Sequence, residues 1–431
     1  MEGYLHAAGV GLLRSRPHVP RWTRSEPVLF ASATLFGVAV LISHRPDVVL
    51  HAQLWGDDGK KWLFDAYTYG LGRVFLPYEG YLGVFQGVAA AGVLLAPLSW
   101  APLLFALVAL AVQSLPFAFL ATDRLALVVP RRYVRVLAGV ACLSVPTIIE
   151  LLGTLTNTQW SLAVLAALVV AAPRVRGWSW RIFDFMVVLL SGLSGPFCIF
   201  LLLPAAGIAW RRRSSSQWAL TWCVLATSLI QGVAIAASAG LQRPALLTPV
   251  MPSAVLGLKL LVDRMALVPI VGANSAYRAS GALPLWGDLA LGLAIAGVFA
   301  GALAIASAEM RLLLTFGLLV LAGTLIASRT TWAQMLHPYY GERYWFIPML
   351  AWLLALTLLA ARRRARLVGP ACAAAIVLFA VLAAPAGWLY PSLPNPHFQR
   401  SVLELESARP GQSVDFGAED PGWRFQLTRK S

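Results

Sequence analysis

Long apolar runs, separated by short arginine-rich linkers, constrain this chain more than any other feature. A helix needs about 20 mostly apolar residues to cross a hydrocarbon core about 30 Å thick, whereas the strands of a membrane barrel are about ten residues long and alternate in polarity. The runs match the first pattern. With 59% hydrophobic and 12% charged residues, the chain also lies far from soluble domains, which are about 25% charged. The sequence therefore predicts an all-α polytopic integral membrane protein.

The basic residues indicate membrane orientation. The formal net charge is +15, but most arginines lie in the linkers between apolar runs, where they mark the cytoplasmic side. No nucleic-acid partner is expected. The four cysteines all fall inside apolar segments, which argues against disulfides in an external loop; they are Cys142, Cys198, Cys223 and Cys372.

The topology depends on whether the run Tyr81–Pro97 crosses the membrane. If it crossed together with Ala101–Ala121, the basic linker 123–135 would lie outside, against the positive-inside rule. An interfacial helix at Tyr81–Pro97 avoids this conflict and leaves about eleven spans, a cytoplasmic N-terminus and an external C-terminus. The expected spans are Pro27–Ser43, Ala101–Ala121, Val134–Leu152, Gln159–Ala172, Arg181–Leu193, Pro196–Trp210, Gln217–Gly240, Trp286–Ser307, Arg311–Ser328, Tyr344–Ala361 and Leu367–Gly387.

This topology divides the chain into a transmembrane domain, residues 1–387, and an external C-terminal tail, residues 388–431. It places the polar loops 44–100, 241–285 and 329–343 on the external face together with the tail. Within the tail, the alternating stretch Gly422–Leu427 is able to pair as a short hairpin.

The first external loop carries two adjacent acids, Asp57 and Asp58, in the stretch Trp55–Gly80. One interpretation is a helix N-cap, with Gly70 as a plausible C-cap. Capping needs only one carboxylate, however. A carboxylate held among apolar walls has a raised pKa and suits a general base that takes a proton from a hydroxyl group. We expect one of the two to be this base, with a slight preference for Asp58. The alternative for the pair is coordination of a divalent metal such as Mg²⁺ or Mn²⁺, although two adjacent acids without a third ligand are weak evidence for such a site.

Basic residues near these acids are candidate phosphate ligands. Lys60, Lys61 and Arg73 share the loop, and each is also able to extend toward lipid head groups. Arg343 stands where a late span begins, and an arginine at a helix end is a good ligand for an anionic head group. Together they are expected to bind the phosphate of a membrane-embedded donor.

Further polar and aromatic residues fall at helix ends on the same external face. They are candidate substrate contacts, although turn formation explains some of them equally well, and an interfacial aromatic belt explains others. An aromatic ring such as Trp160 provides a platform for sugars, and His337 has a pKa suited to proton transfer. The set consists of Glu79, Asn157, Gln159, Trp160, His337, Glu342 and Tyr344.

The order of these motifs resembles the GT-C superfamily of membrane glycosyltransferases, which includes protein O-mannosyltransferases and bacterial lipid A aminoarabinose transferases. Asp57-Asp58 stands at the position of that superfamily's acidic motif, and Leu76–Gly80 resembles the Pro-rich stretch before its interfacial helix. Leu193–Pro196 resembles its Lys-Gly-Pro turn, and Arg343-Tyr344 with Pro348 resembles a late motif. Ser194 replaces the lysine of the aminoarabinose branch, so the substrate contacts of that branch do not carry over.

The resemblance implies an inverting glycosyltransferase in a bacterial inner membrane. Its donor would be a sugar on a polyprenyl phosphate, and its acceptor a cell-envelope glycan, lipid or protein on the external face. The alternative is a transporter or a flippase for lipid-linked saccharides. Transporters place ionisable residues inside their spans and often contain repeats; here the acids Glu150 and Asp184 fall near the ends of expected spans, and no repeat is visible. A membrane acyltransferase would favour a His paired with an acid inside the bilayer, which the sequence does not show.

Overall fold

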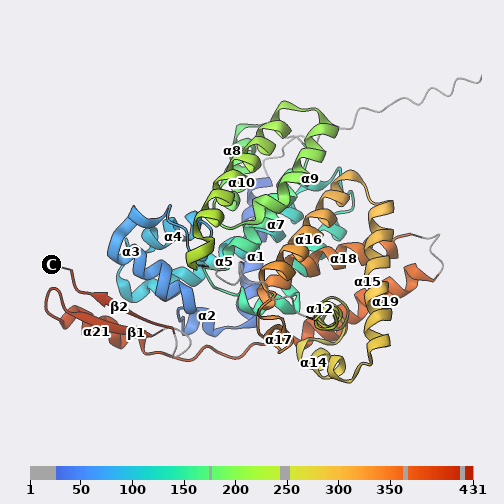
Figure 1. The fold of residues 1–431 in the computed structure, drawn as a ribbon. Coiled ribbons are helices and arrows are strands. Elements are labelled where there is room, and N and C mark those ends of the chain that lie inside the picture. The colour runs from blue at the N-terminus through green and yellow to red at the C-terminus, as the bar shows by residue number, and fades with distance from the viewer. Residues whose placement is uncertain (1–25, 174–176, 243–252, 363–366, 418–422, 431) are drawn as a thin grey trace, which may run out of the picture.

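A computed structural model describes residues 26–173, 177–242, 253–362, 367–417 and 423–430. Within these ranges the chain is mainly helical (Figure 1). The α-helices are α1 (Glu26–His44), α2 (Asp47–Leu50), α3 (Phe64–Tyr69), α4 (Val84–Val93), α5 (Ala101–Ala121), α6 (Arg132–Ser144), α7 (Thr158–Ala171), α8 (Trp178–Gly192), α9 (Phe197–Arg212), α10 (Ser215–Gln242), α12 (Ala254–Val262), α13 (Val268–Val271), α14 (Ala273–Ala282), α15 (Leu285–Ile305), α16 (Ala308–Ala327), α17 (Trp332–Met335), α18 (Phe346–Ala360), α19 (Val368–Leu378), α20 (Ala384–Ala386) and α21 (Phe398–Ser407).

Shorter helical turns join these helices. The π-helical turns are η1 (Asp58–Leu63), η6 (Asp263–Leu267) and η8 (Phe379–Ala383). The 3-10 turns are η2 (Gly70–Arg73), η3 (Leu98–Trp100), η4 (Asp123–Leu125), η5 (Pro146–Glu150) and η7 (Glu342–Trp345). The strands β1 (Ser413–Gly417) and β2 (Arg424–Thr428) form one antiparallel pair.

Seven helical segments in the described ranges are long and apolar enough to cross a membrane. They are Glu26–His44, Leu98–Ala121, Ser215–Ser238, Leu285–Ile305, Ala308–Ala327, Glu342–Ala360 and Val368–Ala386. The chain is thus a helical protein of the integral membrane type. Helices α6 to α9 coincide with the other four expected spans, but they have only 13 to 16 residues, and about 20 are needed to cross. The count of eleven spans therefore stays a prediction.

The expected span Val134–Leu152 is not one continuous helix. Helix α6 ends at Ser144, and Pro146 opens the 3-10 turn η5. The residue before a proline is forced toward extended backbone, and Val145 has a ψ of 137°. This break turns residues 146–157 into an irregular segment, which carries Glu150 and Thr156 into the candidate site described below.

One segment that is predicted to be external contains more structure than its sequence suggested. The segment 241–285 holds α12, η6, α13 and α14, while its residues 243–252 lie outside the described ranges. Helix α4 fills the middle of the predicted interfacial helix Tyr81–Pro97. Its ten residues extend about 15 Å, which is too short to cross the membrane.

The C-terminal tail folds into a small module made of α21, β1 and β2. The hairpin predicted around Gly422–Leu427 is confirmed for Arg424–Leu427, which pair with residues 414–417; Gly422 itself lies outside the described residues. The module lies beside α2 and α3 (Figure 1). Its buried side chains Phe398, Phe416 and Leu427 share one hydrophobic cluster with Leu54 and Leu63 of the first loop. The tail is therefore packed onto the site-bearing loop.

Small residues allow the membrane helices to approach closely, as is usual where lipid provides no hydrophobic drive. On α16, a Cβ added to Gly317 would overlap the Ala351 methyl group of α18, whereas one added to Gly297 of α15 would meet no atom within 4 Å.

We predict that Gly317→Leu lowers the thermal unfolding temperature of the purified protein, because overpacking a tight contact costs about 1–3 kcal/mol. Gly297→Leu is the matched control and should leave the temperature unchanged. Equal melting of the two variants would contradict the α16–α18 contact.

Candidate functional site

Asp58 is completely enclosed and joins the first loop to the segment before α7. Its side chain is 1% exposed. Its carboxylate accepts hydrogen bonds from Leu155 N at 2.9 Å and Thr156 N at 2.8 Å, and from Thr156 Oγ1 at 2.6 Å. Trp62 Nε1 donates to the same hydroxyl at 2.9 Å. Burial outweighs the hydrogen bonds from Thr156 and Leu155, which lower the pKa of Asp58, and the net result is a pKa raised to about 7. Asp58 therefore positions the backbone rather than facing open space.

Asp57, in contrast, lines a cavity of about 350 Å³. The Tyr78 hydroxyl donates to its Oδ1 at 2.6 Å. Burial raises the pKa of Asp57, while the Tyr78 hydrogen bond and the positive charges of Arg343, Lys60 and Lys61 lower it. Of the two predicted acids, the structure places Asp57 where a ligand in the cavity is able to reach it.

A tight turn holds Tyr78 and Tyr81 at this cavity. The two residues form an antiparallel bridge, and the residues between them, Glu79 and Gly80, have φ angles of 52° and 86°. Positive φ at both central residues is the geometry of a type I′ turn. This conformation is unusual for Glu79, and strained backbone of this kind often accompanies function.

The cavity brings together predicted residues from distant parts of the chain. Besides Asp57, the predicted residues that line it are Glu79, Asn157, Gln159, Trp160, Arg343 and Tyr344. Apolar side chains of three helices also line it: Phe200 from α9, Ile235 from α10, and Val320 and Ala327 from α16. One space therefore combines polar groups from the loops with apolar groups from helices.

The other predicted phosphate ligands do not line this cavity. Lys61 forms an ion pair with Asp65, and the Arg73 guanidinium lies 3.9 Å from the same carboxylate and over the Tyr69 ring. Lys60 is exposed and lies over the ring of Trp423, which does line the cavity. The loop lysines thus contribute positive charge near Asp57 rather than direct cavity contacts.

Aromatic rings and Arg343 form a continuous wall, defined here by five contacts. The ring centroids of Phe197 and Trp160 lie 4.5 Å apart, and those of Trp160 and Tyr344 lie 5.6 Å apart. The Arg343 guanidinium follows, at 4.8 Å from the Tyr344 ring and 5.7 Å from the Trp55 ring. Trp423 of the C-terminal module closes the series, 6.4 Å from Trp55. This aromatic wall leads from α9 to the C-terminal module.

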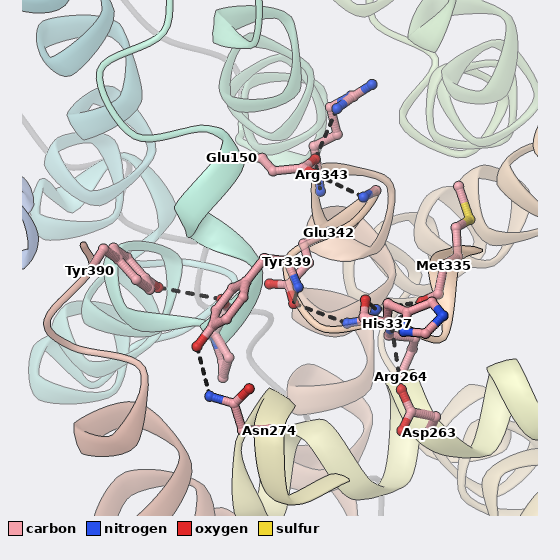
Figure 2. Close-up of polar contacts among 12 residues, drawn as sticks. Glu150, Asp263, Arg264, Asn274, Met335, His337, Tyr339, Glu342, Arg343 and Tyr390 are labelled. Carbon is pink, nitrogen blue, oxygen red and sulfur yellow. Dashed lines mark hydrogen bonds and ion pairs between the residues drawn. The ribbon is translucent and has the colours of Figure 1, made fainter. Parts of the chain in front are cut away.

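Glu150 fixes Arg343 (Figure 2). Its Oε2 accepts from the Arg343 guanidinium at 2.9 Å and from the Arg343 backbone at 3.2 Å, while its Oε1 accepts from Gly341 N at 2.8 Å. The Arg343 side chain keeps 27% of its surface exposed. One carboxylate from the broken α6–α7 segment therefore orients the arginine and leaves part of it accessible.

Arg264 anchors the same loop from its other side (Figure 2). Its side chain is 1% exposed and lies 3.1 Å from Oε1 of Glu342, which is fully buried. It also donates to the carbonyl oxygens of Met335 and His337. Glu342 in turn accepts from Tyr339 N at 3.0 Å. The predicted residues Glu342 and His337 therefore hold the loop 335–343 rather than line the cavity.

The Asp57–Asp58 pair does not fit a divalent metal. Both Asp58 oxygens accept protein hydrogen bonds, and a tight site needs several free oxygen ligands. Within the described ranges, no group of three or more His, Cys, Asp or Glu residues is placed to hold a metal ion.

Four residues contribute to this region without having been predicted from the sequence: Tyr78, Tyr81, Arg264 and Trp423. The Tyr78–Tyr81 turn had a local signal in its Glu-Gly pair, since such pairs favour hairpin turns when glycine supplies positive φ. Arg264 and Trp423 had no comparable signal, because their partners are far away in the sequence.

Comparisons with protein-family models, with curated proteins and with solved structures found no match to this chain.

We predict that Arg264→Met destabilises the protein by about 3–5 kcal/mol, because it leaves the buried Glu342 carboxylate without its cation. The control is Arg400→Met. Arg400 is 80% exposed in its pair with Glu404, and loss of an exposed pair costs about 0–1 kcal/mol. Thermal unfolding in detergent measures both variants. A melting temperature for Arg264→Met equal to that of Arg400→Met would show that the buried cluster does not hold the loop.

Proposed function

We propose that this protein is a membrane glycosyltransferase that moves a sugar from a polyprenyl-phosphate donor to an acceptor hydroxyl. The observation that carries the proposal is the cavity itself, in which Asp57 and Arg343 share one space with aromatic rings and with apolar side chains from α9, α10 and α16. This combination fits a donor with an apolar chain, an anionic phosphate and a sugar ring. The order of motifs resembling the GT-C superfamily supports the same assignment.

The arrangement suits a direct displacement. Asp57 takes the proton of the acceptor hydroxyl as general base, and the oxygen attacks the anomeric carbon from the face opposite the phosphate. The bond between that carbon and the phosphate oxygen breaks, and its electron pair leaves with the polyprenyl phosphate. Arg343 stabilises the leaving phosphate through charge-assisted hydrogen bonds. A single displacement of this kind inverts the anomeric configuration, and no protein nucleophile is needed.

We assign the base role to Asp57 and a positioning role to Asp58. The sequence alone slightly favours Asp58 as the base. Asp58, however, already accepts three hydrogen bonds from Leu155 and Thr156, whereas Asp57 lines the cavity. The proposed site faces the exterior of a bacterial inner membrane, and its acceptor is a glycan, lipid or protein of the cell envelope.

A transporter or lipid-linked-saccharide flippase is the alternative, since a cavity with polar and apolar parts suits the passage of such a lipid. Paired ionisable residues on helical segments are a feature of transporters, and Lys259 and Asp288 form such a pair at 3.5 Å, in which Asp288 is fully buried and the Lys259 side chain is 30% exposed. Neither residue lines the cavity. The enzyme proposal is preferred because the charged groups that do line it are suited to group transfer.

The decisive test supplies purified protein with radiolabelled polyprenyl-phosphate sugars and candidate acceptors. Asp57→Asn should lower kcat about 10²–10⁴-fold, the usual contribution of a general base. The exposed Asp415 of β1 provides the control Asp415→Asn, with unchanged activity. Full activity in Asp57→Asn would refute the base assignment. Absence of transfer with every donor, combined with movement of lipid-linked sugar across vesicles, would favour the flippase.

Asp58→Asn should behave differently from Asp57→Asn. An amide at position 58 turns one hydrogen-bond acceptor into a donor, which then faces the backbone N–H group of either residue 155 or residue 156. A buried mismatch of this kind costs about 1–3 kcal/mol. We therefore expect a lower unfolding temperature for Asp58→Asn and a nearly unchanged one for Asp57→Asn. The reverse order would contradict the division of roles.

The pH dependence of transfer provides a separate prediction. Activity requires the ionised Asp57 carboxylate, so the rate rises with pH through the pKa of Asp57. The Tyr78 hydroxyl lowers this pKa; its removal in Tyr78→Phe should therefore raise the pKa and move the acid limb of the kcat/KM profile to higher pH. Tyr67→Phe, in the same loop but outside the cavity lining, should leave the limb unmoved. A shift of the Tyr78→Phe limb to lower pH would contradict the assignment.

A further inference from the structure

The C-terminal module is fixed on the first loop by close packing. A Cβ added to Gly59 would lie 2.6 Å from Cε1 of Phe425, so the β2 ring rests directly on the backbone of η1. Lys430 lies 4.8 Å from the centre of the Tyr67 ring, and Gln399 donates to the Ser99 carbonyl oxygen at 2.7 Å. The position of Trp423, immediately before β2, is therefore set by the fold.

This packing brings Trp423 to the cavity next to the proposed base. A Cβ on Gly56 would lie 3.3 Å from the Trp423 indole, so the indole covers the backbone immediately before Asp57. Its ring plane makes an angle of 27° with that of Trp55. Both indoles line the cavity, and Lys60 lies 5.3 Å from the centre of the Trp423 ring.

The order of the aromatic wall separates two ends of the site. At one end Phe197 and Phe200 belong to α9, and Phe200 packs against Gly323 of α16; this end suits an apolar chain. Arg343 stands between Tyr344 and Trp55. Trp423 lies beyond Trp55, away from the apolar end and beside Lys60.

We propose that Trp423 and Trp55 form the acceptor subsite and that this subsite binds a sugar ring, so that the acceptor is a saccharide. The inference rests on the proposed function, in which lipid and phosphate occupy the side from Phe200 to Arg343. The acceptor hydroxyl must then approach Asp57 from the side of the C-terminal module. Flat indole faces suit the apolar face of a sugar ring, while Lys60 and the Asp57 carboxylate provide polar partners for its hydroxyl groups.

The test first measures binding without catalysis. Protein in lipid nanodiscs is mixed with a panel of free oligosaccharides built from hexoses, pentoses or N-acetylhexosamines, and saturation transfer to the sugar C–H protons is recorded by NMR. We expect transfer to at least one sugar for the unmodified protein, at least a fivefold loss in Trp423→Ala, and retention in Trp423→Phe. Trp210→Ala is the control, because Trp210 is 70% exposed at the far end of α9 and should retain the signal.

Kinetics then tie the subsite to transfer. Trp423→Ala should raise the acceptor KM about tenfold, equivalent to about 1.4 kcal/mol of binding, and leave the donor KM unchanged. If the Trp423→Ala variant unfolds, the Trp423→Phe variant keeps the test valid, because the phenylalanine variant should fold and bind the sugar. Absence of saturation transfer from the unmodified protein to any sugar, or an unchanged signal in Trp423→Ala, would overturn the subsite. Sugar binding that depends on Trp423 without any transfer would uphold the subsite and reject the transferase.

Discussion

The site depends on one buried carboxylate. Asp58 binds the backbone and the hydroxyl group of residues about a hundred positions later in the sequence, and it thereby fixes the first loop against the segment that precedes α7. A buried carboxylate is costly unless it is fully hydrogen-bonded. Three donors meet that requirement here. Because Asp57 is the neighbouring residue, the same interaction determines where the Asp57 carboxyl group lies, at the lining of the cavity.

A second constraint follows from the broken helix. In a membrane protein, irregular backbone is tolerated where it is buried in protein or lines a cavity. Pro146 ends the regular helix, and the segment that follows satisfies its polar groups through side chains: Gln113 donates to the Leu151 carbonyl oxygen, and Gly153 N donates to Gln113. Glu150 at the end of η5 reaches the loop before α18. The break in one helix thus creates the support for Arg343.

Much of the helical framework could be predicted from the sequence, because an apolar run of sufficient length has few alternatives in a membrane. Candidate site residues could also be predicted at positions where polar, charged or aromatic residues interrupt these apolar runs, as at Asp57, Gln159 and Arg343. The choice between Asp57 and Asp58 could not be predicted, since it depends on Leu155 and Thr156. The burial of Glu342 likewise depends on Arg264, which lies 78 positions away. Local patterns do not encode such partners.

Two arginines in this region illustrate why residue type alone does not define a role. Arg264 and Arg343 each face a carboxylate at about 3 Å, yet the Arg264 side chain is 1% exposed and that of Arg343 is 27% exposed. The enclosed Arg264 donates its hydrogen bonds to Glu342 and to carbonyl groups of the loop, so its role is to hold the loop backbone in place. Arg343 is oriented by Glu150 and still presents surface at the cavity. The chemistry proposed for the site therefore rests on a difference in burial between the two arginines. The buried pair of Arg264 and Glu342 holds the loop in place, and the partly exposed Arg343 extends from that loop toward the cavity.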